Sequence, residues 1–333
     1  MRFLKRVLTV IVVVSIIYLL GPHPSHPVYT IDLPDVPSVD TALEKYISQQ
    51  ESQHKIKPDN EARIIWANDS LKQKSEYAIV YLHGFSASQE EGNPVHRNIA
   101  KKFGCNLYLS RLSQHGVDTT DALFNMTADN LWESAKQAYA IGKQLGKKVL
   151  LMGTSTGGTL ALQLAAAYPE IAGLVLYSPN IAVNDPNAWL LNNPWGLQIA
   201  RLVKKSDLNT AKTDSPDYKQ YWNYQYRLEA IVQLEELLET SMNTPTFAKV
   251  KQPTLTLYYY KDEKHQDPVV KVSAMKEMMV ELSTPIDQKK MVAIPEAGNH
   301  VLASPIQSKD IVRVEKETVA FFKEILHLQA VEH

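Results

Sequence analysis

The stretch that decides the fold is Val149-Leu150-Leu151-Met152-Gly153-Thr154-Ser155-Thr156-Gly157-Gly158-Thr159-Leu160-Ala161-Leu162. Residues 149–152 are all apolar, which is typical of a parallel strand buried on both faces of a sheet. Residues 153–157 then fit the G-x-S-x-G pattern, in which a serine sits on a sharp turn between a strand and a helix. Small residues flank that serine because strand and helix approach closely there. Ser155 is therefore the predicted nucleophile.

The alternation of strands and helices continues on both sides of this stretch. Strands alternating with helices of 10–15 residues predict βαβ units and a mostly parallel sheet, so the predicted fold class is α/β. Strands are expected at residues 62–67, 77–82, 106–109, 171–177, 254–260 and 290–294, and helices at 40–56, 94–103, 128–145, 270–282 and 308–328.

The alternation stops between residues 182 and 250. This region is rich in tryptophan and tyrosine, ends in a helical pattern, and has no strand pattern. We expect a helical insertion that forms a lid over the carboxyl edge of the sheet. The alternative is an ordinary surface subdomain whose aromatic residues fill only its own core.

The N-terminus predicts a membrane anchor. Arg2, Lys5 and Arg6 precede an apolar run, and from residue 3 to residue 21 this run approaches the roughly 17–25 residues of a membrane helix. No small-residue cleavage site follows, which favours an uncleaved signal anchor over a cleaved signal peptide. Because basic flanks stay cytoplasmic, the folded domain is expected on the extracytoplasmic side, periplasmic or extracellular.

These patterns divide the chain into five parts. The predicted parts are a transmembrane signal anchor at residues 1–21, a Pro-rich linker and surface helix at 22–60, the first part of the α/β core at 61–181, the lid at 182–250, and the second part of the core at 251–333.

Charge and cysteine content exclude several classes of protein. The net charge is −1 at pH 7, so no basic surface favours nucleic acid as a partner. Cys105 is the single cysteine, which excludes an intramolecular disulfide and a multi-cysteine metal site. Cys105 lies beside an apolar strand pattern and is expected to be a buried, inert thiol.

A serine hydroxyl needs a base to take its proton, usually a histidine that a carboxylate holds in the right tautomer. These groups must share one edge of the sheet, so each is expected in a loop just after a strand. His300, in Gly298-Asn299-His300, follows the last predicted strand and is the expected base. The alternative is a surface-loop histidine.

Two aspartates compete for the role of the acid. Asp262 lies closer to the end of the preceding strand, whereas Asp267 stands immediately before an apolar helix start. Asp267 is favoured, and the other aspartate is expected to be a helix cap or a solvated charge. Glu263 and Glu296 are further alternatives.

An acyl-transfer site also needs backbone N–H groups that stabilise the oxyanion. Thr156, directly after the nucleophile, is one expected donor, and Phe85 of His83-Gly84-Phe85 is the other. His83 is then expected to brace this loop. The alternative is a plain turn at the end of a strand.

Four motifs together resemble the α/β-hydrolase superfamily, within it the monoacylglycerol lipase and carboxylesterase branch. The resemblance covers residues 62–328 and implies a sheet of about eight strands, no metal, no organic cofactor, and a small-molecule ester or lipid substrate. The loop between Tyr260 and Asp267 is longer than usual in that branch. The motifs are Leu82-His83-Gly84-Phe85, Arg111-Leu112-Ser113-Gln114-His115-Gly116, Gly153-Thr154-Ser155-Thr156-Gly157-Gly158 and Gly298-Asn299-His300.

The expected function is hydrolysis of carboxylic esters through an acyl-enzyme on Ser155. A peptidase or amidase of the same fold is the alternative, because the motif does not separate the two. A membrane-tethered binding scaffold without activity would have lost a member of the triad, and none is lost.

Overall fold

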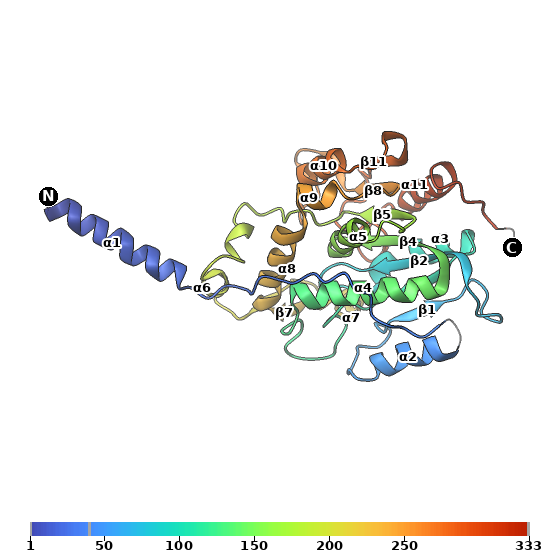
Figure 1. Ribbon diagram of the computed structural model, residues 1–333, viewed down its shortest axis with the longest axis horizontal. Helices are drawn as coiled ribbons and strands as arrows, with labels where there is room; N and C mark the ends of the chain where they lie inside the picture. Colours follow the sequence, from blue (N-terminus) through green and yellow to red (C-terminus); the bar gives the residue numbers. More distant parts are fainter. Residues whose placement is uncertain (1, 39–40, 332–333) are drawn as a thin grey trace.

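A computed structural model describes residues 2–38 and 41–331, and its centre is a seven-stranded sheet (Figure 1). The strand order is β1-β3-β2-β4-β5-β8-β11. Six strands are parallel, and β1 pairs antiparallel with β3 at one edge. The α/β class is confirmed, and in the described residues the central sheet has seven strands instead of about eight. They are β1 Arg63–Ile65, β2 Ser75–Leu82, β3 Asn106–Leu109, β4 Gly146–Thr154, β5 Gly173–Tyr177, β8 Thr254–Tyr258 and β11 Lys289–Ala293.

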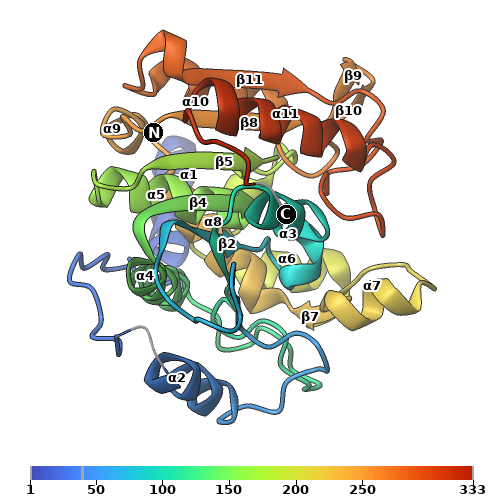
Figure 2. The same ribbon diagram turned by 90° about the vertical axis from the view of Figure 1, so that its right-hand side faces the viewer.

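Helices cover both faces of the sheet. Helices α3 (Val95–Lys102) and α11 (Ile311–Glu324) pack on one face, and α4 (Ala128–Leu145), α5 (Thr156–Ala167) and α10 (Val272–Glu281) pack on the other (Figure 2). Side chains point alternately to the two faces of the sheet along a strand, so β2 and β4 contribute side chains to the hydrophobic cores on both faces. Both strands are therefore apolar throughout their buried part. Because the parallel strands end at one edge, the loops that follow them meet there.

The lid, residues 182–250, is not purely helical. It contains a short antiparallel ribbon in which β6 pairs with β7, contrary to the expectation of an insertion without strands. Each ribbon strand has only three residues, too few to show an alternating pattern. The lid comprises η2 Ala188–Leu190, α6 Gly196–Lys204, β6 Leu208–Thr210, α7 Pro216–Tyr221, β7 Gln225–Arg227, α8 Leu228–Ser241 and α9 Thr244–Phe247.

The N-terminal helix α1 (Arg2–Leu19) projects from the body of the molecule beside α6 of the lid (Figure 1). Trp195 joins the two, because its indole N–H donates to the Ile17 carbonyl oxygen at 3.0 Å. The expected membrane-spanning anchor at residues 1–21 is not supported, since no helix in the described residues is both long and apolar enough to cross a membrane. Three basic residues occupy the first turns of α1 and shorten its apolar run.

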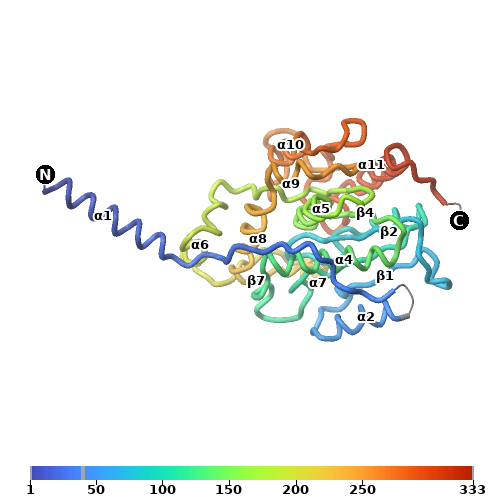
Figure 3. Tube along the Cα trace, viewed as in Figure 1, coloured from blue at the N-terminus to red at the C-terminus, as the bar shows by residue number. Residues whose placement is uncertain are grey.

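Residues 22–38 form a strap that lies along α4 before the chain reaches helix α2 (Thr41–Glu51), as the trace in Figure 3 shows. The Trp132 indole and the Lys136 ammonium group donate to the strap, the former to the Thr30 carbonyl oxygen at 2.7 Å. The Tyr168 hydroxyl donates to the Ile31 carbonyl oxygen. Residues 22–38, the predicted Pro-rich linker, contain neither helix nor strand, and they pack on the core because their carbonyl groups are bound there.

Candidate active site

Ser155 stands on the turn between β4 and α5, as predicted. Its φ of 52° and ψ of −117° place a non-glycine residue in a strained backbone region, which is common at functional sites. The Ser155 N–H donates to the Tyr177 carbonyl oxygen at 2.9 Å, which ties the turn to the neighbouring strand. A Cβ on Gly157 would collide with the Leu82 carbonyl oxygen, and one on Gly153 would lie 2.5 Å from backbone atoms of Gly157. Glycine is required at both flanks for this turn to form.

The structure joins Asp267 and His300 in a buried pair. His300 Nδ1 lies 2.7 Å from Asp267 Oδ2, and Asp267 is fully buried. The other carboxylate oxygen accepts hydrogen bonds from the N–H groups of Val269 and Val270, at 2.9 and 3.0 Å. These bonds explain why an acid stands directly before an apolar segment: the first N–H groups of that segment bind the carboxylate of Asp267. His300 Nε2 is left as the nitrogen available to a proton from Ser155.

The charges of this pair stabilise each other. Burial alone would raise the pKa of Asp267, but the His300 charge and the hydrogen bonds from His300, Val270 and Val269 lower it overall. Burial would lower the pKa of His300, but the charge and hydrogen bond of Asp267, with a contribution from Glu91, raise it overall. Asp267 is therefore held as a carboxylate, which favours the proton on His300 Nδ1.

Asp262, the alternative acid, pairs with a different histidine. The long loop after β8 contains a hairpin of β9 (Tyr260–Asp262) and β10 (His265–Gln266). Asp262 Oδ1 lies 2.9 Å from His265 Nδ1, and both side chains are more than half exposed. The hairpin accounts for the extra length of the loop and carries Asp262 away from His300. Glu263 bonds Tyr260, and Glu296 pairs with Lys261, both at the surface.

The loop after β2, here called the oxyanion loop (residues 83–91), is braced by His83. His83 Nε2 accepts a hydrogen bond from the Leu112 N–H at 3.0 Å, so Nδ1 carries the ring proton and donates to the Gly84 carbonyl oxygen at 2.9 Å. Burial holds the pKa of His83 well below its usual value, so the ring is neutral. The Gly84 carbonyl and the Phe85 N–H belong to one planar peptide unit. His83 therefore fixes the direction of the Phe85 N–H.

Thr156, the second expected donor, is the first residue of α5. Its N–H has no acceptor within the helix, because the first N–H groups of any helix lack one. The positive end of the helix dipole adds to its attraction for an anion. Thr156 is fully buried directly after Ser155, at the end of the helix where this N–H has no helical acceptor.

Ser155 and His300 line one cavity of about 750 Å³, covered by the lid. Most of the lid residues in its wall are apolar, although Asp185, Lys204 and Glu235 also line it, and further polar side chains come from the core. No group of three or more metal-ligating side chains lies together in residues 2–38 and 41–331. The apolar wall includes Leu190, Leu191, Ile199, Val203, Ile231 and Leu234, and the polar groups include Ser86, Glu91, Asn299 and Gln307.

Glu91 is a residue of this site that the sequence analysis missed. It is 2% exposed, borders the cavity, and accepts a hydrogen bond from the Gly84 N–H at 2.5 Å. Its place a few residues after the His83-Gly84-Phe85 motif was the available signal. Glu91 was missed because it lies in the polar segment Gln89-Glu90-Glu91, and such a segment is typical of a solvent-exposed surface.

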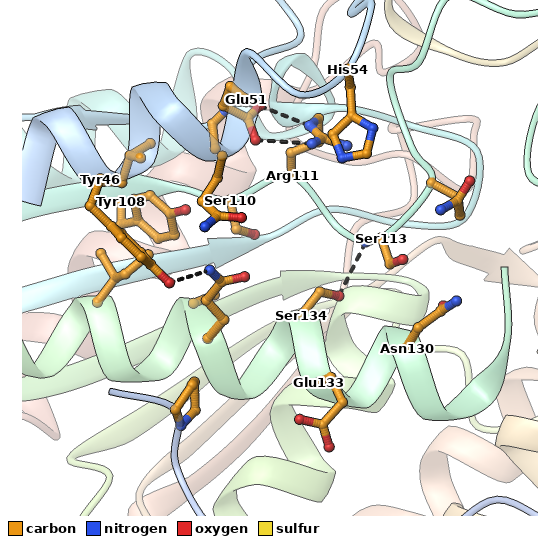
Figure 4. Close-up of a pocket in the computed structure, with 18 residues that line it drawn as sticks. Tyr46, Glu51, His54, Tyr108, Ser110, Arg111, Ser113, Asn130, Glu133 and Ser134 are labelled. Atoms are coloured by element: carbon orange, nitrogen blue, oxygen red, sulfur yellow. Dashed lines mark hydrogen bonds and ion pairs between the residues drawn. The ribbon is translucent and has the colours of Figure 1, made fainter. Parts of the chain in front are cut away.

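A second cavity, of about 410 Å³, lies between α2, α4 and the loop after β3 (Figure 4). Its polar side chains pair with one another. Arg111 binds both carboxylate oxygens of Glu51 at 2.8 and 3.0 Å, and the Gln137 amide donates to the Tyr46 hydroxyl. We interpret this cavity as part of the scaffold that carries the Arg111 loop.

Comparisons with known proteins agree with this geometry. The family model described as serine aminopeptidase, S33, matches residues 122–297, more than half of the chain. The chain belongs to this family. A curated relative, the thermostable monoacylglycerol lipase of Bacillus sp. (strain H-257), is 29% identical over 194 residues, which cover 57% of this chain and 71% of the relative.

Solved structures agree on the fold of this S33 family member. One belongs to a description of LipS and LipT, two metagenome-derived lipolytic enzymes. It has a TM-score of 0.64 and 18% identity, and the match covers 80% of this chain and 99% of that chain. The monoacylglycerol lipase of Paleococcus ferrophilus has a TM-score of 0.57, 15% identity, and coverage of 78% and 96%. The sequence-based recognition of the α/β-hydrolase superfamily, in its monoacylglycerol lipase and carboxylesterase branch, is confirmed. An ester-bond hydrolase is supported at the level of the family.

Proposed function

We propose that this protein is a serine esterase that cleaves long-chain carboxylic esters such as monoacylglycerols. The observation that carries the proposal is the buried Asp267–His300 pair, 2.7 Å apart, at a cavity that Ser155 also lines. The apolar side chains of the cavity wall suit an acyl chain, and its polar side chains, among them Ser86 and Gln307, suit a small alcohol. A relative named as a monoacylglycerol lipase supports this substrate class.

The proposed reaction has two stages. Ser155 Oγ attacks the ester carbonyl carbon while His300 Nε2 takes the hydroxyl proton, and the N–H groups of Phe85 and Thr156 bind the oxyanion. His300 returns the proton to the alcohol oxygen as the C–O bond breaks, which leaves an acyl ester on Ser155. Water then attacks this ester with His300 again as base, and the carboxylic acid leaves. Asp267 orients His300 throughout.

The first test replaces the proposed nucleophile. Ser155→Ala should lower kcat on p-nitrophenyl esters at least about 10⁴-fold and abolish labelling by a fluorophosphonate, because no other hydroxyl takes its place. Ser178→Ala is a matched control, since Ser178 is also fully buried and directly follows the neighbouring strand β5. Comparing p-nitrophenyl esters with acyl chains from acetate to palmitate shows which chain length the cavity accepts. Wild-type protein that neither labels nor hydrolyses any ester of the series would refute the esterase proposal.

A peptidase or amidase is the second candidate, favoured by the description of the family as serine aminopeptidases. Amide and ester substrates use the same triad, so the assay must compare them directly. Aminoacyl p-nitroanilides and p-nitrophenyl esters offered to the same preparation separate the two. Higher kcat/KM on the anilides would replace the esterase proposal.

We also propose that α1 associates with a membrane. Its described residues are all exposed, and Leu202 and Val203 of the adjacent α6 are exposed as well. Apolar side chains with basic residues at one end suit a bilayer with anionic headgroups. Flotation with phosphatidylglycerol vesicles should carry the full chain and leave behind a variant that lacks residues 1–20. Placement on the extracytoplasmic side stays a prediction, tested by protease accessibility in intact and lysed cells.

A further inference from the structure

Glu91 is a buried carboxyl group beside the nucleophile to which the proposed reaction gives no role. It lies in the short helix η1 (Gln89–Gly92) at the end of the oxyanion loop, and it borders the same cavity as Ser155 and His300. Buried carboxyl groups are costly unless they are hydrogen-bonded or neutralised. Its partners therefore indicate what it does.

The closest partner of Glu91 is the backbone of Gly84. The Gly84 N–H donates to Glu91 Oε2 at 2.5 Å. A Cβ built on Gly84 would lie 2.9 Å from both oxygens of Glu91 and 3.1 Å from the Ser155 Cβ. The carboxyl group, the Gly84 backbone and the nucleophile are therefore packed against one another.

Glu91 and His83 together fix both peptide units of Gly84. Glu91 binds the Gly84 N–H, and His83 Nδ1 binds the Gly84 carbonyl oxygen, which shares a plane with the Phe85 N–H. Glycine has more backbone freedom than any other residue. The Ala87 N–H also donates to the Gly84 carbonyl oxygen, at 3.2 Å. Loss of either side-chain bond leaves the Gly84 backbone, and with it the direction of the Phe85 N–H, less restrained.

The lid meets the oxyanion loop at the same place. The Trp222 side chain is close enough to the Glu91 carboxyl group to lower its pKa, and the Asn223 N–H donates to the Ser86 carbonyl oxygen at 2.7 Å. The Phe85 ring packs edge-on against Tyr226, with ring centroids 5.0 Å apart. Glu91 thus stands between the lid and the backbone that carries the Phe85 N–H.

The charge of Glu91 also reaches the proposed base. Burial raises the pKa of Glu91 to about 7, against the opposing effects of the Gly84 N–H, His300 and Trp222. A Glu91 carboxylate raises the pKa of His300 in turn. The other titratable side chains that interact with its charge are Tyr81 of β2 and Tyr218 of α7, whose own pKa values are raised.

We propose that Glu91 is a positioning residue: it orients the Phe85 N–H through Gly84 and connects the docking of the Trp222 segment of the lid to the oxyanion hole. The proposal rests on the proposed function, because an oxyanion hole matters only for acyl transfer. Glutamine at this position retains an acceptor for the Gly84 N–H but carries no charge, so it separates the effect of the hydrogen bond from the effect of the charge on His300.

The test compares Glu91→Ala, Glu91→Gln and Glu90→Gln in the full chain on a p-nitrophenyl ester. Glu91→Ala should lower kcat about 10²-fold with KM within threefold, as expected for the loss of one oxyanion donor. Glu91→Gln should retain kcat within about fivefold and move the acid limb of kcat/KM to lower pH, because the charge that raises the His300 pKa is gone. Glu90→Gln, in the same turn, should change neither. Trp222→Phe should lower kcat in the same sense as Glu91→Ala, by less.

An unchanged kcat in Glu91→Ala would overturn the proposal, and so would an equal loss in both Glu91 variants with an unmoved pH profile. If Glu91→Ala does not fold, the pH profiles of Glu91→Gln and Glu90→Gln decide: identical profiles overturn the proposal. Failure of the proposed function is distinguishable, since wild-type protein would then not hydrolyse the p-nitrophenyl ester, whatever the Glu91 variants do.

Discussion

Two aspartate–histidine pairs lie at the carboxyl edge of the sheet, and their geometry is almost the same. Asp262 and His265 are 2.9 Å apart, and Asp267 and His300 are 2.7 Å apart. The first pair is on the β9–β10 hairpin with both side chains more than half exposed, whereas Asp267 is 0% and His300 9% exposed. Distance alone does not make a catalytic pair.

What separates the two pairs is the environment of each carboxylate. Water competes for Asp262 and screens its attraction to His265, and surface pairs of this kind contribute little to stability. Asp267 is shielded from water, and its second oxygen is bound by the N–H groups of Val269 and Val270. A charge held in this way acts on His300 more strongly and in one fixed direction.

The largest effect is expected from Asp267→Asn. The asparagine amide would donate to His300 Nδ1 and force the proton onto Nε2, so His300 could no longer accept the Ser155 proton. We expect kcat on a p-nitrophenyl ester to fall about 10³- to 10⁴-fold. Asp262→Asn is the matched control and should stay within twofold. Equal losses in the two variants would show that the two pairs do not differ in function.

The residues of the strand–turn–helix at Ser155 could be predicted because their pattern is local. The apolar strand, the two glycines and the small-residue helix each report a constraint within a few residues of Ser155. The helix at Ala128–Leu145 was predicted with its observed bounds for the same reason. His300 was predicted from its place after the last strand.

The remaining features depend on contacts between distant parts of the chain. Neither the hairpin that removes Asp262 from the site nor the strap that binds Trp132 and Tyr168 has a local pattern. Glu91 lies in a polar segment whose burial depends on the lid, more than a hundred residues away in sequence. Cys105, by contrast, lies in a buried strand region as expected, and burial raises the pKa of its thiol to about 12.

A smaller effect is expected in the pH dependence of kcat/KM. The proposed reaction requires His300 to be neutral at Nε2, and Asp267 raises the His300 pKa. The acid limb of the wild-type profile should therefore lie above the ordinary histidine value of about 6.5, and in Asp267→Asn the residual activity should extend to lower pH. An Asp267→Asn profile with its acid limb unmoved, measured with enough enzyme to follow the residual rate, would contradict this account of the pair.

The Asp267–His300 pair also predicts the direction in which stability changes with pH. The folded pKa of Asp267 is lowered, so its stabilisation is present above the ordinary aspartate value of about 3.9 and is lost as the pH falls through the folded value. The folded pKa of His300 is raised, so its stabilisation is present below about 6.5 and is lost as the pH rises through the folded value. Urea unfolding across this range should show both slopes in wild type and smaller ones in Asp267→Asn, where other carboxylates with lowered pKa values, such as Glu44 and Asp118, still contribute.

The smallest effect is expected at the exposed pair. His265→Ala removes the partner of Asp262, but Asp262 also accepts hydrogen bonds from the N–H groups of Lys264 and His265, which the substitution retains. The turn of the hairpin should therefore persist, and water should replace the lost imidazole. We expect the midpoint of urea unfolding, kcat and the pH profile to match those of wild type. A change in kcat of more than threefold would mean that the hairpin reaches the site through the Asp267 N–H, which donates to the Tyr259 carbonyl oxygen at the base of the hairpin. The contrast between the two pairs would then be one of degree.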